Sequence, residues 1–250
     1  MKYLILSDIH SNLEALEATL AHAGRIGFDK VALLGDLVGY GASPNEAVEI
    51  VRSFDAVWEI RGNHDKVVSL IDNGEQFNIM ARSSCEWTRK ALEDDNLEYV
   101  KSLQQGPVGV EDTFFLSHGT PLDEDAYILT DLDALEVFRF FPHRICFYGH
   151  SHIPLFFTQG GPNGIVWDAP GINEDEKTMD LDPDMRYLLN PGSVGQPRDR
   201  NPKASYCIFD SEGDGRVTLY RVEYDIKKAQ DKIVQAGLPK FLAERLALGV

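Results

Sequence analysis

The chain carries at residues 31–39 the sequence Val31-Ala-Leu-Leu-Gly35-Asp36-Leu-Val-Gly39, in which four apolar residues run directly into Gly35 and Asp36. A short, unbroken apolar run that ends in glycine is typical of a strand buried on both faces, such as the central strand of a layered α/β sheet. Asp36 then lies at the carboxyl end of this strand, and ligands of such sheets bind in the crevice outside those ends. We therefore interpret Asp36 as a residue placed for chemistry.

Four other apolar runs, at 2–6, 56–60, 113–116 and 145–148, also end at side chains that can bind metals. These side chains are, in chain order, Asp8, His10, Asn63, His64, Asp65, His118, His150 and His152. Five of the seven histidines thus follow strand-like runs, whereas we assign structural roles to His22 and His143. Imidazole combined with carboxylate and carboxamide oxygen suits two divalent first-row metals held close together, because a carboxylate can bridge two ions.

The composition indicates one soluble domain. With 250 residues and 43% hydrophobic content, the chain can bury one large core. The three cysteines form no C-x-x-C pair, and no apolar stretch is long enough for a signal peptide or a membrane span, so we expect a cytoplasmic protein without a membrane partner. The net charge of -16 argues against long nucleic acid. It permits a small phosphate ester, because bound metal ions dominate the field inside a site.

The first 65 residues have the pattern of a βαβαβ unit with parallel strands. Its helices are expected from a capping box at residues 11–14 to Gly24, and from Ser43 to about Ser53. Residues 66–105 show no strand pattern, and we expect two helices there, at 77–92 and 97–103, as a cap beside the site.

Hairpin patterns dominate the second half and indicate a mixed sheet packed on the first. They pair 154–158 with 165–167, and 204–209 with 217–222, across glycine-containing turns. Residues 168–184 hold seven acids and one lysine, and we expect a solvated acidic loop, with a binding role as the alternative. The tail after residue 225 is expected to be helical, and it docks either on the domain or on a second subunit, so a homo-oligomer stays open.

Taken together, the motifs resemble those of the calcineurin-like metallophosphoesterase superfamily. In chain order they are Asp8-x-His10, Gly35-Asp36-x-x-Gly39, Gly62-Asn63-His64-Asp65, His118 and Gly149-His150-x-His152. The flanking sequences, including Asn190-Pro-Gly-Ser193-Val-Gly-Gln-Pro-Arg198, are similar to the small one-domain bacterial and archaeal branch. The resemblance implies an α/β (α+β) fold over residues 1–250, a four-layer αββα sandwich of two mixed β-sheets flanked by helices.

The resemblance also implies a dinuclear site. In the family's arrangement, Asp36 bridges two divalent ions, with Asp8, His10 and His152 on one ion and Asn63, His118 and His150 on the other. We expect manganese, iron or zinc. Such a pair generates a shared hydroxide near neutral pH, which attacks phosphorus in line.

One departure from the family narrows the substrate. Where the serine/threonine protein phosphatases continue Gly-Asp-x-x-Asp-Arg-Gly, this chain has Gly39-Tyr40-Gly41. It lacks at these positions the aspartate and arginine used there around the catalytic histidine and the phosphate. We therefore expect hydrolysis of small phosphodiesters or of nucleotides such as dinucleoside polyphosphates, with a phosphomonoesterase or protein phosphatase as the alternative.

The remaining candidates lie around the ligand set. His64 is the histidine not needed for coordination, and its expected role is proton transfer to the leaving oxygen or stabilisation of charge. Asp65 either orients His64 or serves as a cap or turn carboxylate. Asn12, Tyr40 and Arg198 are candidate substrate contacts, with helix capping, packing or an exposed loop as their alternatives.

Two further functional classes agree less well with the sequence. A protein-interaction scaffold of this fold that has lost its metals has no need of the complete ligand set. A metallo-β-lactamase-like hydrolase requires His-x-His-x-Asp-His, whereas His150-Ser-His152 continues Ile-Pro-Leu.

Overall fold

Two mixed sheets form the centre of the molecule, in a computed structural model that describes residues 1–55, 57–160, 164–171 and 174–250. The first sheet has the strand order β3 (Val57–Glu59), β2 (Lys30–Leu33), β1 (Lys2–Leu6), β11 (Ala204–Asp210), β12 (Arg216–Val222) and β9 (Glu176–Asp180). The second has the order β4 (Val108–Val110), β5 (Phe114–Ser117), β6 (Ile145–Tyr148), β10 (Arg186–Asn190), β7 (Leu155–Gln159) and β8 (Ile165–Asp168).

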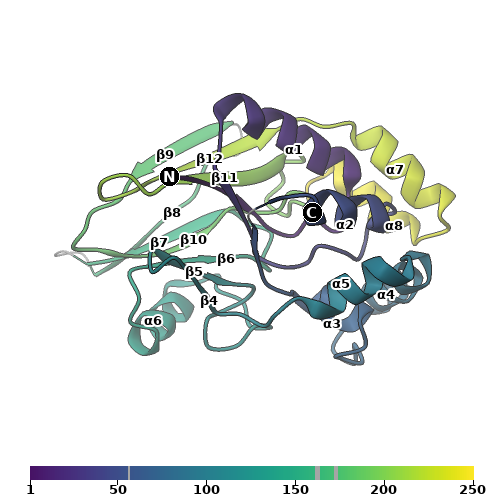
Figure 1. The fold of residues 1–250 in the computed structure, drawn as a ribbon, viewed down its shortest axis with the longest axis horizontal. Coiled ribbons are helices and arrows are strands. Elements are labelled where there is room, and N and C mark those ends of the chain that lie inside the picture. Colours follow the sequence, from purple (N-terminus) through teal and green to yellow (C-terminus); the bar gives the residue numbers. More distant parts are fainter. Residues whose placement is uncertain (56, 161–163, 172–173) are drawn as a thin grey trace.

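Helices cover the outer faces of both sheets (Figure 1). The first sheet is covered by α1 (Leu13–Ile26) and α2 (Pro44–Arg52), and the second by α6 (Asp131–Phe140). The chain ends in α7 (Ile226–Gln235), α8 (Lys240–Glu244) and the 3-10 helix Arg245–Ala247. The four-layer αββα sandwich expected from the family resemblance is thus confirmed.

Strand β1 shows why the layers form, since its alternate side chains enter two different cores. Tyr3 and Ile5 lie between the two sheets, while Leu4 and Leu6 pack in the core that α1 and α2 cover. The parallel pairs β1–β2 and β2–β3 confirm the expected βαβαβ unit.

Both expected hairpins are present as strand pairs, β7–β8 and β11–β12, but they belong to different sheets. Strand β11 pairs antiparallel with β1, so the β11–β12 hairpin extends the first sheet. The turn of the other hairpin includes residues 161–163, which lie outside the described residues. The first helix also differs in detail: its N-cap is Asn12, whose Oδ1 accepts a hydrogen bond from the backbone N–H of Ala15, in place of the expected Ser11.

The acidic segment 168–184 was expected to be a loop, and this prediction is wrong for residues 176–180. They form the edge strand β9, which pairs antiparallel with β12. Lys177 and Met179 are half-buried while Glu176, Thr178 and Asp180 are exposed. Met179 packs on the core between the sheets, and Lys177 forms an ion pair with Asp168. The high acid content of the segment hid this two-residue period.

Three helices come from the part of the chain between β3 and β4. They lie together at one end of the molecule, at the lower right of Figure 1. They are α3 (Asn63–Val68), α4 (Ile79–Ala91) and α5 (Asp94–Ser102). The two helices expected in residues 66–105 correspond to α4 and α5. The short α3 begins directly at the Asn63-His64-Asp65 motif.

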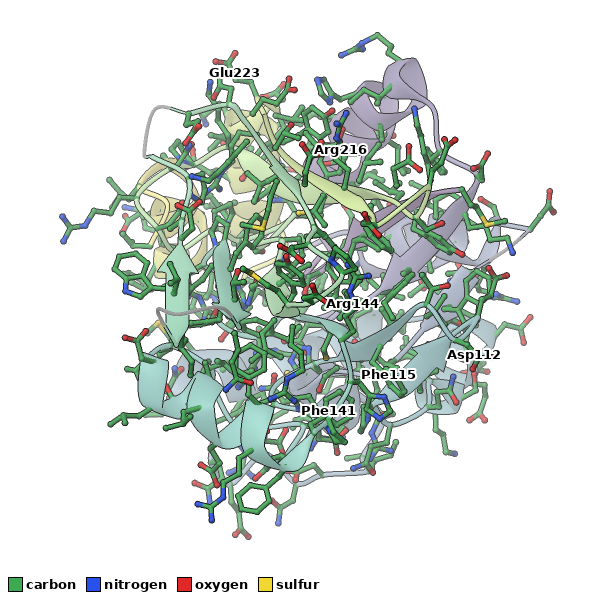
Figure 2. All side chains as sticks on the ribbon, turned by 90° about the vertical axis from the view of Figure 1, so that its left-hand side faces the viewer. Asp112, Phe115, Phe141, Arg144, Arg216 and Glu223 are labelled. Atoms are coloured by element: carbon green, nitrogen blue, oxygen red, sulfur yellow. The ribbon has the colours of Figure 1, made fainter. Side chains whose placement is uncertain are left out.

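The histidines assigned structural roles pack on aromatic side chains. His143 packs against Phe115 and Phe141, with ring centroids 3.9 and 4.6 Å away. Figure 2 shows Phe115 and Phe141 close together at the end of the sandwich that faces away from α3–α5. The Nδ1 atom of His22 lies 2.7 Å from the hydroxyl of Tyr206. Among the described residues, no helix is long and apolar enough to cross a membrane.

Candidate metal centre

The loops that follow β1, β2, β5 and β6 meet at one edge of the sandwich and are joined by backbone hydrogen bonds. The N–H of Asp8 donates to the carbonyl of Gly35 at 3.1 Å, and the N–H of Gly149 donates to the carbonyl of His118 at 2.8 Å. The two sheets are also joined here, because the N–H of His150 donates to Oδ2 of Asp8 at 3.2 Å. Side chains that are far apart in the sequence therefore converge on one site.

The backbone at this edge is strained. A positive φ is rare outside glycine and costs energy that the surrounding structure must supply. Five of the predicted metal ligands adopt it: Asp8 (52°), His10 (49°), Asp36 (52°), His150 (66°) and His152 (60°). Such clustering of strained residues is typical of functional sites.

One group of possible ligand atoms, all within 4.8 Å of one another, comes from Asp8, His10, Asp36 and His152. The Nε2 atoms of His10 and His152 lie 3.2 Å apart. Oδ1 of Asp8 lies 3.3 Å from Nε2 of His152. All four side chains are buried.

A second group with the same spacing comes from Asp36, His118 and His150, so that Asp36 belongs to both. Oδ1 of Asn63 lies 3.0 Å from Nε2 of His118 and therefore borders this second group. The Nε2 atom of His150 lies 3.1 Å from the backbone carbonyl of Asp125. Because a carbonyl can only accept, this contact leaves Nδ1 of His150 unprotonated and able to bind a metal.

The hydrogen bonds of the histidine Nδ1 atoms show that the two groups of ligand atoms fit cations. Nδ1 of His10, His118 and His152 lies 3.2, 2.8 and 2.6 Å from a backbone carbonyl, so each neutral ring carries its proton there and a lone pair on Nε2. The lone pairs of His10 and His152 then face each other across 3.2 Å. In addition, the buried Oδ1 of Asp8 accepts no hydrogen bond from the described residues. A bound cation would satisfy all of these atoms.

Burial and neighbouring charges shift the pKa values of the candidate ligands. Burial, assisted by the charge of Asp36, raises the pKa of Asp8 to about 7, and burial raises that of Asp36 well above its usual range. Burial also lowers the pKa values of His10 and His152 well below 6.5, with the charge of Arg198 adding to the effect. Cations at this position would offset the cost of keeping two carboxylates ionised and buried.

Comparisons with known proteins agree with this geometry. The family model described as "Calcineurin-like phosphoesterase superfamily domain" matches residues 1–214. The chain belongs to this superfamily of metal-dependent phosphoric ester hydrolases. The uncharacterized protein MJ0912 of Methanocaldococcus jannaschii is 41% identical over 98% of this chain and 97% of its own length.

Solved structures of bacterial and archaeal proteins have the same fold. A metallophosphoesterase from Sphaerobacter thermophilus is 38% identical, covers 100% of this chain and 99% of its own, and has a TM-score of 0.84. The hypothetical protein PH1004 from Pyrococcus horikoshii OT3 is 22% identical with a TM-score of 0.78, covering 100% of this chain and 98% of its own. The second of these supports the fold alone.

In this phosphoesterase, His64 lies next to the ligand groups and is buried among aromatic rings. Its ring centroid is 4.2 Å from that of Tyr40, 4.7 Å from that of Phe77 and 4.8 Å from that of His10. Its backbone N–H donates to Oδ1 of Asp36 at 2.8 Å. Burial, followed by the charge of Arg198, lowers the pKa of His64 well below 6.5, so its imidazole is neutral.

Asp65 adopts the capping role that the sequence left open. Its two carboxylate oxygens accept hydrogen bonds from the backbone N–H groups of Gly62 at 2.9 Å, Val38 at 3.1 Å and Leu37 at 3.3 Å. The side chain thereby ties the loop after β2 to the first turn of α3. Asp65 thus holds Asp36 and His64 in position through the backbone.

The three candidate substrate contacts are separated by the structure. Tyr40 and Arg198 line a cavity of about 130 Å³ beside both ligand groups, together with Asp36 and His64. Asn12 instead caps α1, and its Nδ2 donates to the carbonyl of Gly195 at 2.8 Å, so both ends of its amide have structural partners.

Two further parts of the chain line the site: the helical cap, which is expected beside it, and Tyr127, which no sequence pattern indicates. Residues 76–78 and Ala81 of the helical cap line the same cavity. Tyr127, which also lines it, stacks on His150 with centroids 4.0 Å apart. The loop before Tyr127 is held by Lys66, whose Nζ lies 3.1 Å from Glu124 and 2.5 Å from Asp125. The non-periodic segment 119–128 offers no pattern from which this role could be predicted.

Proposed function

We propose that the chain is a dinuclear-metal-dependent phosphoesterase that hydrolyses small phosphodiesters or nucleotides such as dinucleoside polyphosphates. The observation that carries the proposal is the position of Asp36 between the two groups of ligands. Its Oδ2 lies 3.5 Å from Nε2 of His10 and 3.5 Å from Nε2 of His118. A carboxylate placed in this way can bridge two ions.

In this proposal each ion has its own ligands in addition to Asp36. Asp8, His10 and His152 would hold one divalent ion, and Asn63, His118 and His150 would hold the other. Manganese, iron or zinc suits this mixture of imidazole and oxygen ligands. When bound, such a pair acts as a Lewis acid toward phosphoryl oxygens and lowers the pKa of a water that then serves as nucleophile.

The chain's own side chains orient the ester. Arg198 lines the cavity beside Asp36 and His64, so its guanidinium can donate to a phosphoryl oxygen. Tyr40 packs against the rings of both His10 and His64 and keeps them in place. His64 supplies an N–H donor to the oxygens of the reacting phosphate.

The substrate preference rests on two features. Position 39 is glycine and position 40 is tyrosine, so the aspartate and arginine of the protein phosphatases are missing beside His64. The net charge of -16 disfavours acidic phosphoproteins, which would contact a large part of the surface. A small ester reaches the site without such contacts.

A substrate panel tests the proposal. Protein loaded with manganese would be assayed with bis(p-nitrophenyl) phosphate, p-nitrophenyl phosphate, a cyclic nucleotide, a dinucleoside tetraphosphate and a phosphopeptide, with Asp36→Asn as the control for contaminating hydrolases. We expect kcat/KM to be higher for a diester or the dinucleoside tetraphosphate than for the phosphopeptide. A strong preference for the phosphopeptide would overturn the assignment. A protein that neither binds metal nor hydrolyses any ester would instead be a scaffold.

A further inference from the structure

The Nδ1 edge of the His64 ring faces a place where a side chain is missing. Gly39 lies there with a φ of +91°, and a Cβ built on it would come within 2.6 Å of Nδ1 of His64. Position 39 is also where the protein phosphatase motif has its aspartate. Position 39 therefore supplies no side chain to contact Nδ1 of His64.

Helix α4 of the cap supplies a group to this edge instead. The Sγ atom of Cys85 lies 3.3 Å from Nδ1 of His64, within hydrogen-bonding distance for sulfur. Cys85 is fully buried, so water does not compete for this contact. The aromatic rings of Tyr40 and Phe77 pack against the same imidazole.

The direction of this hydrogen bond decides which ring nitrogen of His64 carries the proton. Burial raises the pKa of the Cys85 thiol above its ordinary value, so the thiol keeps its hydrogen. A thiol that donates to Nδ1 requires a lone pair there, and a neutral imidazole then has its proton on Nε2. Nε2 is the nitrogen at the opposite side of the ring from Cys85. Because His64 lines the cavity beside the ligand groups, this N–H can donate a hydrogen bond to a substrate bound there.

We propose that Cys85 is a positioning residue, which holds the His64 ring by an S–H···Nδ1 hydrogen bond and so fixes the tautomer with an Nε2–H donor for the reacting phosphate. This inference rests on the proposed function for its kinetic consequence. In the protein phosphatases the corresponding motif position is a carboxylate. Here a neutral thiol from the cap takes its place, and the active-site histidine thereby depends on the cap being in position.

A double-mutant cycle tests whether Cys85 acts through His64. With manganese-loaded protein and bis(p-nitrophenyl) phosphate, Cys85→Ala should lower kcat about 3- to 10-fold, the range expected for one hydrogen bond. Cys85→Ser, which keeps a donor, should recover most of this loss. In a His64→Asn background, Cys85→Ala should change kcat little. The matched control is Cys207→Ala, which removes another buried thiol, in β11, and should leave kcat unchanged.

The outcomes separate the two proposals. If the wild-type protein hydrolyses none of the esters in the substrate panel, the proposed function fails. If it hydrolyses one of them, and with that ester Cys85→Ala has no effect or lowers kcat equally in both backgrounds, the positioning role alone is wrong. Nitrogen-15 NMR of the histidine rings gives a readout independent of activity. We expect the His64 proton on Nε2 in the wild type and in Cys85→Ser, whereas a proton on Nδ1 would overturn the inference.

Discussion

The imidazole of His64 has no carboxylate within 4 Å among the described residues, and the nearby Asp65 carboxylate accepts from backbone amides. An imidazolium is therefore not stabilised there, and we expect the neutral ring to act as a hydrogen-bond donor to phosphoryl oxygens. His64→Asn should lower kcat about 100- to 1,000-fold, by similar factors for a p-nitrophenyl ester and an alkyl ester. Metal content should be unchanged. A loss confined to the alkyl ester in steady-state kinetics would show instead that His64 transfers a proton to the leaving oxygen.

Gly62 allows the closest approach between the two loops that carry Asp36 and Asn63. A Cβ at position 62 would lie 2.1 Å from Oδ1 of Asp36, so Gly62→Ala must displace this carboxylate. We expect the variant to lose most of its bound metal and its activity while its circular dichroism spectrum stays that of the wild type. Gly24→Ala is the matched control, because a Cβ there meets nothing within 4 Å in the interior of α1. This variant should keep full activity and gain about 0.5–1 kcal/mol of stability.

Helix α7 docks on α1 through a buried carboxylate. Nζ of Lys232 lies 2.7 Å and Nζ of Lys228 3.2 Å from Oε1 of Glu14, whose side chain is only 2% exposed. Burial alone would raise the pKa of Glu14, but hydrogen bonds from Lys232, the backbone and Lys228 outweigh it and lower the pKa below 4.5. The ion pair should therefore stabilise the fold above about pH 4.5 and lose its effect as the pH falls through the folded-state pKa.

Glu14→Gln should accordingly lower the free energy of unfolding at pH 7 by about 1–3 kcal/mol. Urea unfolding at several pH values measures this, with the exposed Glu17→Gln on the same helix as the control. The difference between wild type and Glu14→Gln should shrink below pH 4.5. A difference that stays constant down to pH 3 would mean that packing, and not the charge of Glu14, stabilises the α1–α7 contact.

Elements with strong periodicity were predictable from the sequence. Strand β6 is apolar throughout, and β1 and β2 are apolar after their first residues, Lys2 and Lys30. The helices α1 and α2 begin with recognisable capping residues or proline. Strand β9 was not predicted. It is an edge strand whose acidic residues are exposed, and the many acids of the segment hid the alternation with the half-buried Lys177 and Met179. The division of the hairpins between two sheets was also not predictable, since it depends on β11 pairing with β1 across 200 residues of chain.

The candidate metal ligands could be proposed from the sequence because each follows a buried strand, and strand ends converge. Contacts made by the cap and by the loop before Tyr127 could not be proposed in this way. Cys85 lies on a helix whose docking depends on tertiary packing, and no local pattern relates it to His64. The sequence therefore predicts which atoms can bind metal better than it predicts what surrounds them.

In the proposed function, one molecule of this phosphoesterase holds two ions joined by Asp36. The most direct test is the metal content of wild-type protein and Asp36→Asn, measured by plasma emission after loading with manganese, together with the turnover of bis(p-nitrophenyl) phosphate. We predict two ions per chain and turnover for the wild type, and loss of cooperative metal binding and of nearly all activity for Asp36→Asn, with the fold largely intact. Two retained ions and wild-type turnover in Asp36→Asn would contradict the dinuclear account.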